Sequence, residues 1–130
     1  MSFTHTFTKS LTAGGVTVAK SFDVTDGSNP RLSETLAGGT TNGQLAFAFD
    51  TAKLKSIWIL ANKDMSIFTN APSTGAPGKT IALKANLPYE WNLDDGYFAN
   101  PFAVSVTTLY YTTGGVDTTF VLETIVDPEV

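Results

Sequence analysis

The stretch that decides the fold runs from residue 54 to residue 91 and opens with Leu-Lys-Ser-Ile-Trp-Ile-Leu at residues 54–60. This run is too short for an isolated helix and is rich in β-branched and aromatic residues, which predicts a buried strand. Residues 62–64, Asn-Lys-Asp, then predict a turn, and residues 65–69 predict a second extended segment.

A third strand is predicted over residues 80–85, after a loop rich in Pro and Gly. Here Ile81 and Leu83 fall on one face, and Ala82 and Lys84 fall on the other. Because the three strands are short and joined by tight turns, we expect an antiparallel meander.

The remaining strands follow from the same alternation, interrupted by turns of Gly, Pro, Asn and Asp. Residues 31–37 give no decisive period and are interpreted as irregular, and Gly114 and Gly115 predict a hairpin turn. The predicted strands cover residues 2–11, 16–24, 43–50, 102–113 and 116–126. No window keeps a helical period, so the sequence predicts a single all-β domain over residues 1–130. We expect an antiparallel β-sandwich of about eight short strands, jelly-roll-like in its connections.

The composition narrows the classes of function. Charged residues make up 15% of the chain, below the typical value of about 25%, so the polar surface must be mostly neutral. The net charge of −4 and the scattered Lys and Arg disfavour nucleic-acid binding. The chain has no cysteine, which excludes disulfides and thiolate zinc sites. We find no export signal and no segment that could span a bilayer, so we expect synthesis in a cytosol and no membrane partner.

Two features could suggest catalysis. Residues 75–80, Gly-Ala-Pro-Gly-Lys-Thr, end like a phosphate-binding loop, but Ser73 stands where that motif needs glycine and no helix is predicted after Thr80. The single histidine, His5, lies between Phe3 and Phe7 without a predicted partner, which is more typical of a packed or edge residue than of a base. We therefore expect no enzyme, no catalytic residue and no cofactor.

Two acidic loops offer oxygen ligands that Ca²⁺ could use. One loop carries Asp23, Asp26 and Asn29, and the other carries Glu90, Asp94 and Asp95. Asp and Asn are also the residues that turns favour, and neither loop has the regular spacing of a calcium-binding loop. We expect plain turns and no metal, and we rank a glycosidase-like pair of these acids lower still.

The aromatic residues divide into two groups. Trp58 lies in the most apolar run and is predicted to be core. Tyr89, Trp91 and Tyr97 lie in a predicted loop, where aromatic side chains can contact a ligand or a protein partner. These three are the candidate contact residues.

Several segments together resemble small β-rich virion proteins of tailed bacteriophages, namely head decoration or cement proteins with a jelly roll or a related sandwich. The resemblance covers the chain from Asp26 to about Thr113 and rests on a rhythm of short apolar strands. Its segments are residues 26–35, 54–60, 64–70 and 80–85, then Pro88, Trp91, Asn100, Pro101, Phe102 and residues 106–110.

This resemblance implies a non-enzymatic structural protein on the outside of the virion head, often a trimer, that binds the major capsid protein and clamps neighbouring capsid subunits. It carries over no individual contact residue. The alternative is a carbohydrate- or receptor-binding sandwich on a phage tail or fibre, with Trp91 and Tyr97 as the platform. Another tail component is a third reading, and a small hydrolase is the least favoured.

Overall fold

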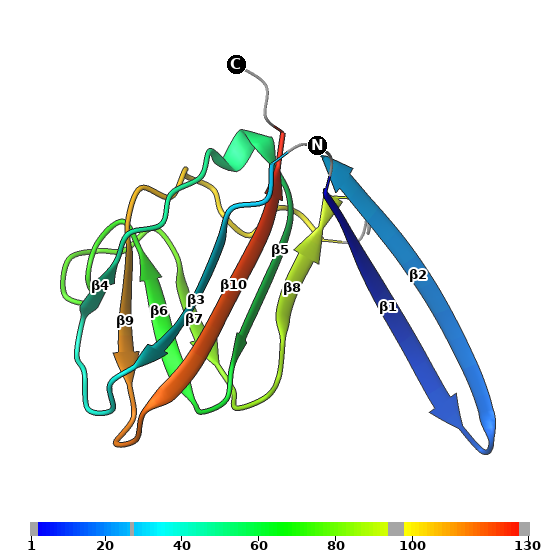
Figure 1. The fold of residues 1–130 in the computed structure, drawn as a ribbon, viewed down its shortest axis with the longest axis horizontal. Coiled ribbons are helices and arrows are strands. Elements are labelled where there is room, and N and C mark those ends of the chain that lie inside the picture. Colours follow the sequence, from blue (N-terminus) through cyan, green and yellow to red (C-terminus); the bar gives the residue numbers. More distant parts are fainter. Residues whose placement is uncertain (1–2, 27, 94–97, 128–130) are drawn as a thin grey trace.

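The computed structural model describes residues 3–26, 28–93 and 98–127. In these ranges the chain forms strands and the short 3₁₀ helix η1 (Thr51–Lys53), and it forms no α-helix. Eight strands build two packed sheets, and the first two strands form a separate hairpin that projects from them (Figure 1). The prediction of an all-β chain built on an antiparallel sandwich is confirmed.

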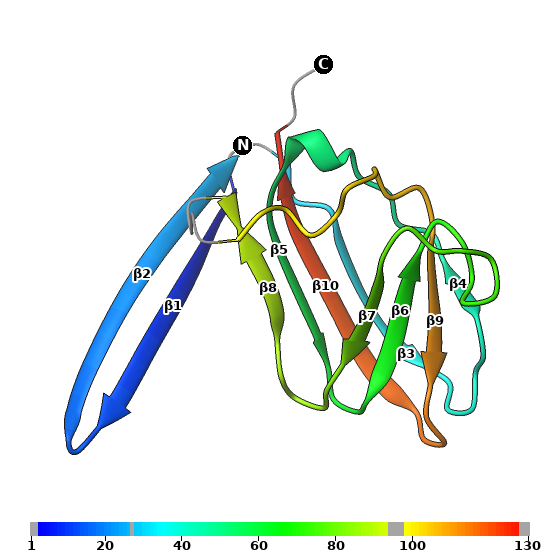
Figure 2. The ribbon, with the colours of Figure 1, turned by 180° about the vertical axis from the view of Figure 1, so that it is seen from behind.

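Each layer of the sandwich is a four-stranded antiparallel sheet. One layer has the order β3 (Arg31–Leu36), β10 (Thr118–Val126), β5 (Leu54–Ala61) and β8 (Tyr89–Asn92). The other has the order β4 (Gly43–Leu45), β9 (Leu109–Thr113), β6 (Met65–Thr69) and β7 (Thr80–Leu83). Figure 1 views the molecule from the β10 side, and Figure 2 views it from the β6 side.

The chain changes sheet at almost every turn, which corrects two predicted pairings. Among the eight strands of the sandwich, only β6 and β7 are consecutive in the chain and lie in the same sheet, so β5 to β7 do not form a meander. Likewise β9 and β10 lie in different sheets, and the turn at Gly114 and Gly115 is a crossover instead of a hairpin. The alternation that predicts a strand is the same whichever sheet the strand joins, so no local pattern indicates that the chain crosses between sheets.

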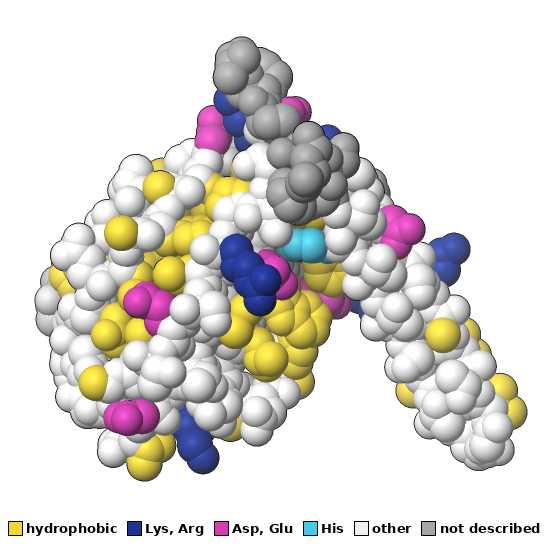
Figure 3. Space-filling view, in the orientation of Figure 1, with side chains coloured by type: hydrophobic (Ala, Val, Ile, Leu, Met, Phe, Trp, Pro, Cys, Tyr) yellow, Lys and Arg dark blue, Asp and Glu magenta, His cyan; other side chains and the backbone are white. Residues whose placement is uncertain are grey.

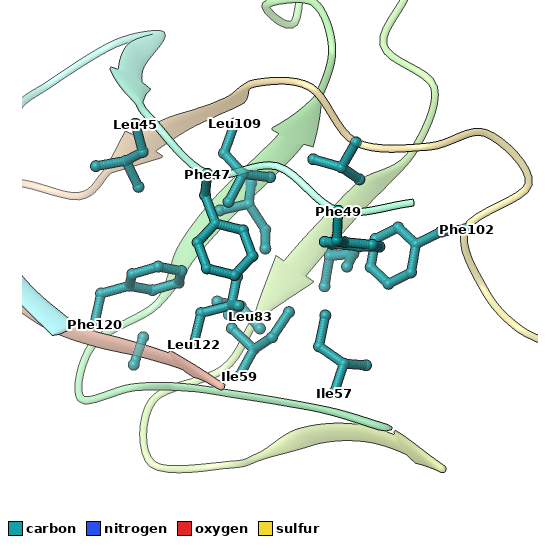
Figure 4. Packing of buried hydrophobic residues seen from close by; sticks show 14 of the residues in the cluster. Leu45, Phe47, Phe49, Ile57, Ile59, Leu83, Phe102, Leu109, Phe120 and Leu122 are labelled. Atoms are coloured by element: carbon teal, nitrogen blue, oxygen red, sulfur yellow. The ribbon is translucent and has the colours of Figure 1, made fainter. Parts of the chain in front are cut away.

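The core lies between the inner faces of the two sheets (Figure 4). Ile57, Ile59 and Phe120 are completely buried, and the rings of Phe49 and Phe102 meet edge to face with centroids 5.3 Å apart. Edge-to-face contact suits the quadrupoles of the two rings and adds to the stabilisation from burial. Leu45, Phe47 and Phe49 point into this core, as their alternation predicts.

Four segments differ from their predictions. Residues 31–37, interpreted as irregular, contain β3, because β10 supplies a ladder for them. The predicted strands at 43–50 and 102–113 are regular only at β4 and β9, although Phe49 and Val106 pair as an isolated bridge between them. Strand β8 lies in a segment predicted to be a loop.

The first two strands stand outside the sandwich and form what we call the arm. Strands β1 (Phe3–Ala13) and β2 (Val16–Asp26) pair along their whole length. Gly14 and Gly15 close the arm with φ of 59° and 81°, a left-handed pair that matches the twist of a two-residue hairpin. The expectation that residues 2–24 belong to the sandwich is therefore wrong, and Figures 1 and 2 show the arm diverging from β8.

Candidate interaction surface on the arm and its junction with the sandwich

The arm is anchored where its base meets the outer face of β5 and β10. His5 Nδ1 lies 2.7 Å from the Ser56 hydroxyl of β5, and Asn29 Nδ2 lies 3.3 Å from His5 Nε2. The same Asn29 amide donates to the Thr124 carbonyl of β10 at 2.6 Å. Because these three contacts join β1 and the segment that follows β2 to two sandwich strands, the base of the arm has a fixed place.

The hydrogen bonds at the base favour a neutral His5. The bond to the Thr124 carbonyl identifies Asn29 Nδ2 as the amide nitrogen, so His5 Nε2 must accept from it. The remaining ring proton then sits on Nδ1 and donates to Ser56. Burial lowers the pKa of His5 below its ordinary value, and Glu123 opposes this effect by favouring the charged ring.

Apolar packing completes the junction. Phe7 and Val24 are buried on the arm, and the Phe7 ring lies 6.5 Å, centroid to centroid, from the ring of Trp58 on β5. The ring of His5 meets Phe7 edge to face at 6.2 Å. A hollow of about 310 Å³ remains beside them, lined by Thr4, His5, Thr6, Phe7, Trp58 and Glu123. The junction is thus partly packed and partly open to solvent.

The two faces of the arm differ sharply in chemistry. One face is a ladder of hydroxyl pairs: Thr4 with Thr25, Thr8 with Ser21 and Thr12 with Thr17, with oxygen separations between 2.7 and 2.9 Å. On this face Thr6 also donates to the Asp23 carboxylate at 2.8 Å. Such cross-strand pairs stiffen a hairpin that has no core of its own.

The other face of the arm is apolar at its base and at its tip, with Lys9 and Lys20 between them, and only the base is covered. Cross-strand pairing places Phe7, Lys9 and Leu11 on this face, opposite residues 22, 20 and 18. Beyond the lysines, Leu11, Val16 and Val18 are exposed by 69%, 65% and 67%. We call these three side chains the tip patch. Hydrophobic side chains grouped on a projecting element mark a surface for contact with another molecule.

The charge of the chain is unevenly divided between the arm and the rest. Residues 1–22 carry two lysines and no Asp or Glu, whereas residues 23–130 carry all twelve acids against six Lys and Arg. Lys9 and Lys20 lie opposite each other in the arm register. The arm itself also contains Asp23 and Asp26, so its two lysines are balanced, and the excess of acids lies in the rest of the chain.

The candidate contact residues are only partly brought together. Tyr89 and Trp91 lie on β8 and line a hollow of about 400 Å³ with Phe98. Trp91 is only 6% exposed, belongs to the core cluster, and its indole N–H donates to the Phe98 carbonyl at 2.9 Å. Burial raises the pKa of Tyr89. Tyr97 lies outside the described residues. A buried Trp91 cannot offer its ring face as a platform.

Trp58, and not Trp91, is the tryptophan that lies partly exposed on the surface of the sandwich. It is only partly buried, and it lies on the outer face of its sheet, opposite Glu123 in the strand register. The prediction of Trp58 as core is wrong because its neighbours Ile57 and Ile59, not Trp58, face inward. What covers Trp58 is the base of the arm.

The other predicted sites separate in space or lie partly outside the described residues. Asp23 belongs to the arm and Asn29 to its junction, while the side chain of Asp26, together with Asp94 and Asp95, falls outside what is described. Among the described side chains, no three His, Asp or Glu gather in a way that could hold a metal ion. After the Gly-Ala-Pro-Gly-Lys-Thr loop the chain enters β7, where a phosphate-binding loop would enter a helix. No helix in the described part of the chain is long and apolar enough to cross a membrane.

Sequence reasoning missed the tip patch. The signal was present in Leu11, Val16 and Val18, which flank the Gly14 and Gly15 turn opposite a run of threonines. It was interpreted as one face of a buried strand, because alternation does not say whether a second layer covers that face. Comparison of the chain with known protein families, curated proteins and solved structures gave no match.

Proposed function

We propose that the chain is a non-enzymatic structural protein of a tailed-bacteriophage virion, a decoration or cement protein on the outside of the head. In this role it binds the major capsid protein and stabilises neighbouring capsid subunits, and it assembles as a homo-oligomer, most simply a trimer. The observation that carries the proposal is the arm, a hairpin with an exposed apolar tip held away from its own sandwich.

An arm of this kind suits a protein that joins neighbours. The sandwich buries its own core without the arm, so the arm is not needed to close the fold. Contacts that are weak one at a time hold a shell when many copies bind adjacent subunits at once. An arm that extends beyond its own sandwich can make such contacts directly.

The strand orders support the jelly-roll part of the proposal. When the eight strands of the sandwich are numbered along the chain from β3 as the first to β10 as the eighth, one sheet has the order 1-8-3-6 and the other has the order 2-7-4-5. All neighbouring strands in these sheets are antiparallel. This arrangement wraps the chain between two sheets as a jelly roll of eight strands does. The carbohydrate-binding alternative loses support, because its platform relied on an exposed Trp91 and that ring is buried.

The test is the location and effect of the protein on particles. Purified protein is added to phage heads that lack it, and the particles are imaged by electron microscopy and heated with and without it. We expect density on the outside of the head, bridging capsid subunits, and a higher temperature of head disruption. Density on the tail, or no binding to virions, would overturn the cement role, and a glycan-array signal that depends on Tyr89 would replace it with the binding module.

A further inference from the structure

We infer that the arm opens from the sandwich as a unit, and that Asn92, a buried amide without a partner beneath the base of the arm, sets the balance between its closed and open forms. In the open form the base of the arm leaves the outer face of the sheet that contains β5 and β10, while the sandwich stays folded. This opening goes beyond the proposed function and does not depend on it.

The surface under the base of the arm is formed by three side chains, which we call the seat. Register places Ser56 of β5 between Asn92 of β8 and Ile125 of β10. They lie on the outer face of the sheet, because the next residue of β5, Ile57, points into the core. Ser56 and Ile125 are nevertheless fully buried, and Asn92 is only 1% exposed. The contact between His5 and Ser56 places the base of the arm over this surface, and Figure 3 shows the single histidine where the arm meets the sandwich.

Asn92 is buried without a hydrogen bond. Neither Nδ2 nor Oδ1 of Asn92 has a partner in the described part of the chain, and neither atom is in contact with solvent. A buried amide that is left unpaired costs the folded protein the free energy of taking it out of water. Water can hydrate this amide once the arm lifts, so Asn92 favours the open form.

The core of the sandwich closes without the arm. Among the described residues, the hydrophobic core cluster runs from Leu36 to Leu122 and takes no member from the arm. Phe7, Val24 and Ile125 are also buried, but they stand outside that cluster. Lifting the arm therefore exposes the junction and leaves the core intact.

The chain is bonded to β10 directly after the arm. Ser28 pairs with Val126 as an isolated bridge, and the Thr124 N–H donates to the Pro30 carbonyl at 3.0 Å. Neither contact involves the arm, so both can persist when it opens. The pivot of the motion therefore lies between Asp26 and Ser28.

The contacts that opening breaks are concentrated at the base of the arm. They include the bonds of His5 to Ser56 and Asn29 and the packing of Phe7 on Trp58. The tip patch is exposed in the closed form already, so opening changes little there. The balance between the two forms is therefore decided where Asn92 lies.

The experiment measures opening by thiol labelling, which the absence of cysteine from the chain makes specific. Ile125→Cys places a thiol in the seat, where a soluble reagent reaches it when the arm lifts. Ile59→Cys places a thiol in the core, where the reagent reaches it when the sandwich unfolds. The labelling rate follows the population of the open form when closing is faster than the reaction. We expect Ile125→Cys to label much faster than Ile59→Cys, and equal rates would show that the arm leaves only on global unfolding and would overturn the inference.

Two substitutions of Asn92 should move the rate in opposite directions. Asn92→Leu removes the unpaired polar atoms and keeps the branching of the side chain, so it should slow the labelling of Ile125→Cys by about 5- to 150-fold. Asn92→Asp places an unpaired carboxylate in the seat, which is costlier to bury, so it should speed that labelling and leave the labelling of Ile59→Cys nearly unchanged. Faster labelling with Asn92→Leu would show that the amide is satisfied in the closed form, and would overturn the inference.

Two other asparagines supply matched controls. The Oδ1 of Asn62 accepts from the Thr119 N–H at 2.9 Å, and a carboxylate can accept the same bond, so Asn62→Asp should not change the labelling of Ile125→Cys. Asn29 donates to the Thr124 carbonyl, so Asn29→Leu should speed the labelling where Asn92→Leu slows it. A rise with Asn62→Asp equal to that with Asn92→Asp, or slower labelling with both leucine variants, would mean that charge or bulk and not the unpaired amide moves the arm, and either result would overturn the inference.

Discussion

The two tryptophans show that residue type and local sequence do not determine whether a side chain is buried. Trp91 lies on a short edge strand beside a predicted turn, yet it is buried and hydrogen bonded. Trp58 lies in the most apolar run of the chain, yet it sits on the outer face of β5 and is covered only by the arm. The difference is one of strand parity, because adjacent residues point to opposite faces of a sheet.

Replacing each tryptophan by alanine should separate these roles. Trp91→Ala should lower the free energy of unfolding by about 3 to 5 kcal/mol, as expected for loss of a large buried ring. Trp58→Ala should lower the free energy of unfolding of the sandwich by less, and it should instead weaken the packing of the arm on β5. Chemical denaturation measures the first effect, and amide exchange of residues 3–26 measures the second. The reverse order of stability losses would contradict the assignment.

His5 predicts a pH dependence of the arm junction. Its pKa is lowered in the folded protein, so near the ordinary value of about 6.5 the unfolded chain binds more protons than the folded one. The contribution of His5 is therefore complete above that value and is lost as the pH falls below it toward the folded pKa. Protonation would also set a ring N–H against the Asn29 amide, which is itself a donor.

The measurement compares the original chain with His5→Gln, which cannot titrate in this range. Amide exchange at the base of the arm should speed up in the original chain as the pH is lowered from about 7.5 to about 5, after correction for intrinsic exchange. The His5→Gln variant should show no such step. An equal response of both proteins would mean that His5 does not control the junction.

At the scale of elements, the crossover turns hold the two sheets together at one end of the sandwich. The turn after β3 and the turn after β9 meet there, where the Gly38 N–H donates to the Asp117 carboxylate at 2.9 Å and the Gly39 N–H donates to the Gly114 carbonyl. A Cβ on Gly38 would lie 2.5 Å from the Val116 carbonyl carbon. Only glycine permits this approach of two backbones.

Gly38→Ala should therefore destabilise the sandwich by about 1 to 3 kcal/mol, the usual cost of forcing extra atoms into a packed site. Gly115 lies in the second of these turns, but a Cβ there would meet nothing within 4 Å. Gly115→Ala should stay within about 0.5 kcal/mol of the original chain. Thermal or chemical unfolding compares the two, and equal losses would show that the backbone approach does not limit stability.

At the scale of the whole molecule, the chain divides into a sandwich with its own core and an arm that is anchored only at its base. Local stability should follow this division, because exchange is slow where backbone hydrogen bonds lie over a buried core and fast where they face solvent. We expect the slowest amide exchange in the central strand β5 and the fastest at the tip of the arm.

Amide exchange at low and high protein concentration tests the division together with the proposed assembly. At low concentration residues 9–20 should exchange much faster than residues 54–61. Raising the concentration should slow exchange in residues 9–20, because the homo-oligomer of the proposed function protects surfaces that the monomer exposes. Protection that does not depend on concentration would contradict a homo-oligomer that involves the arm.

The sequence by itself determined that the chain is all-β and where most of its strands lie, because alternation and turn residues act locally. It placed Ile81 and Leu83 together on one face of a strand, and the structure buries both. Tertiary structure alone decided which strands pair, that residues 31–36 form β3, that Trp91 is buried while Trp58 is not, and that the arm leaves the sandwich. Each of these depends on what covers a face or completes a ladder, and those partners lie far away in the chain, beyond the reach of any local pattern.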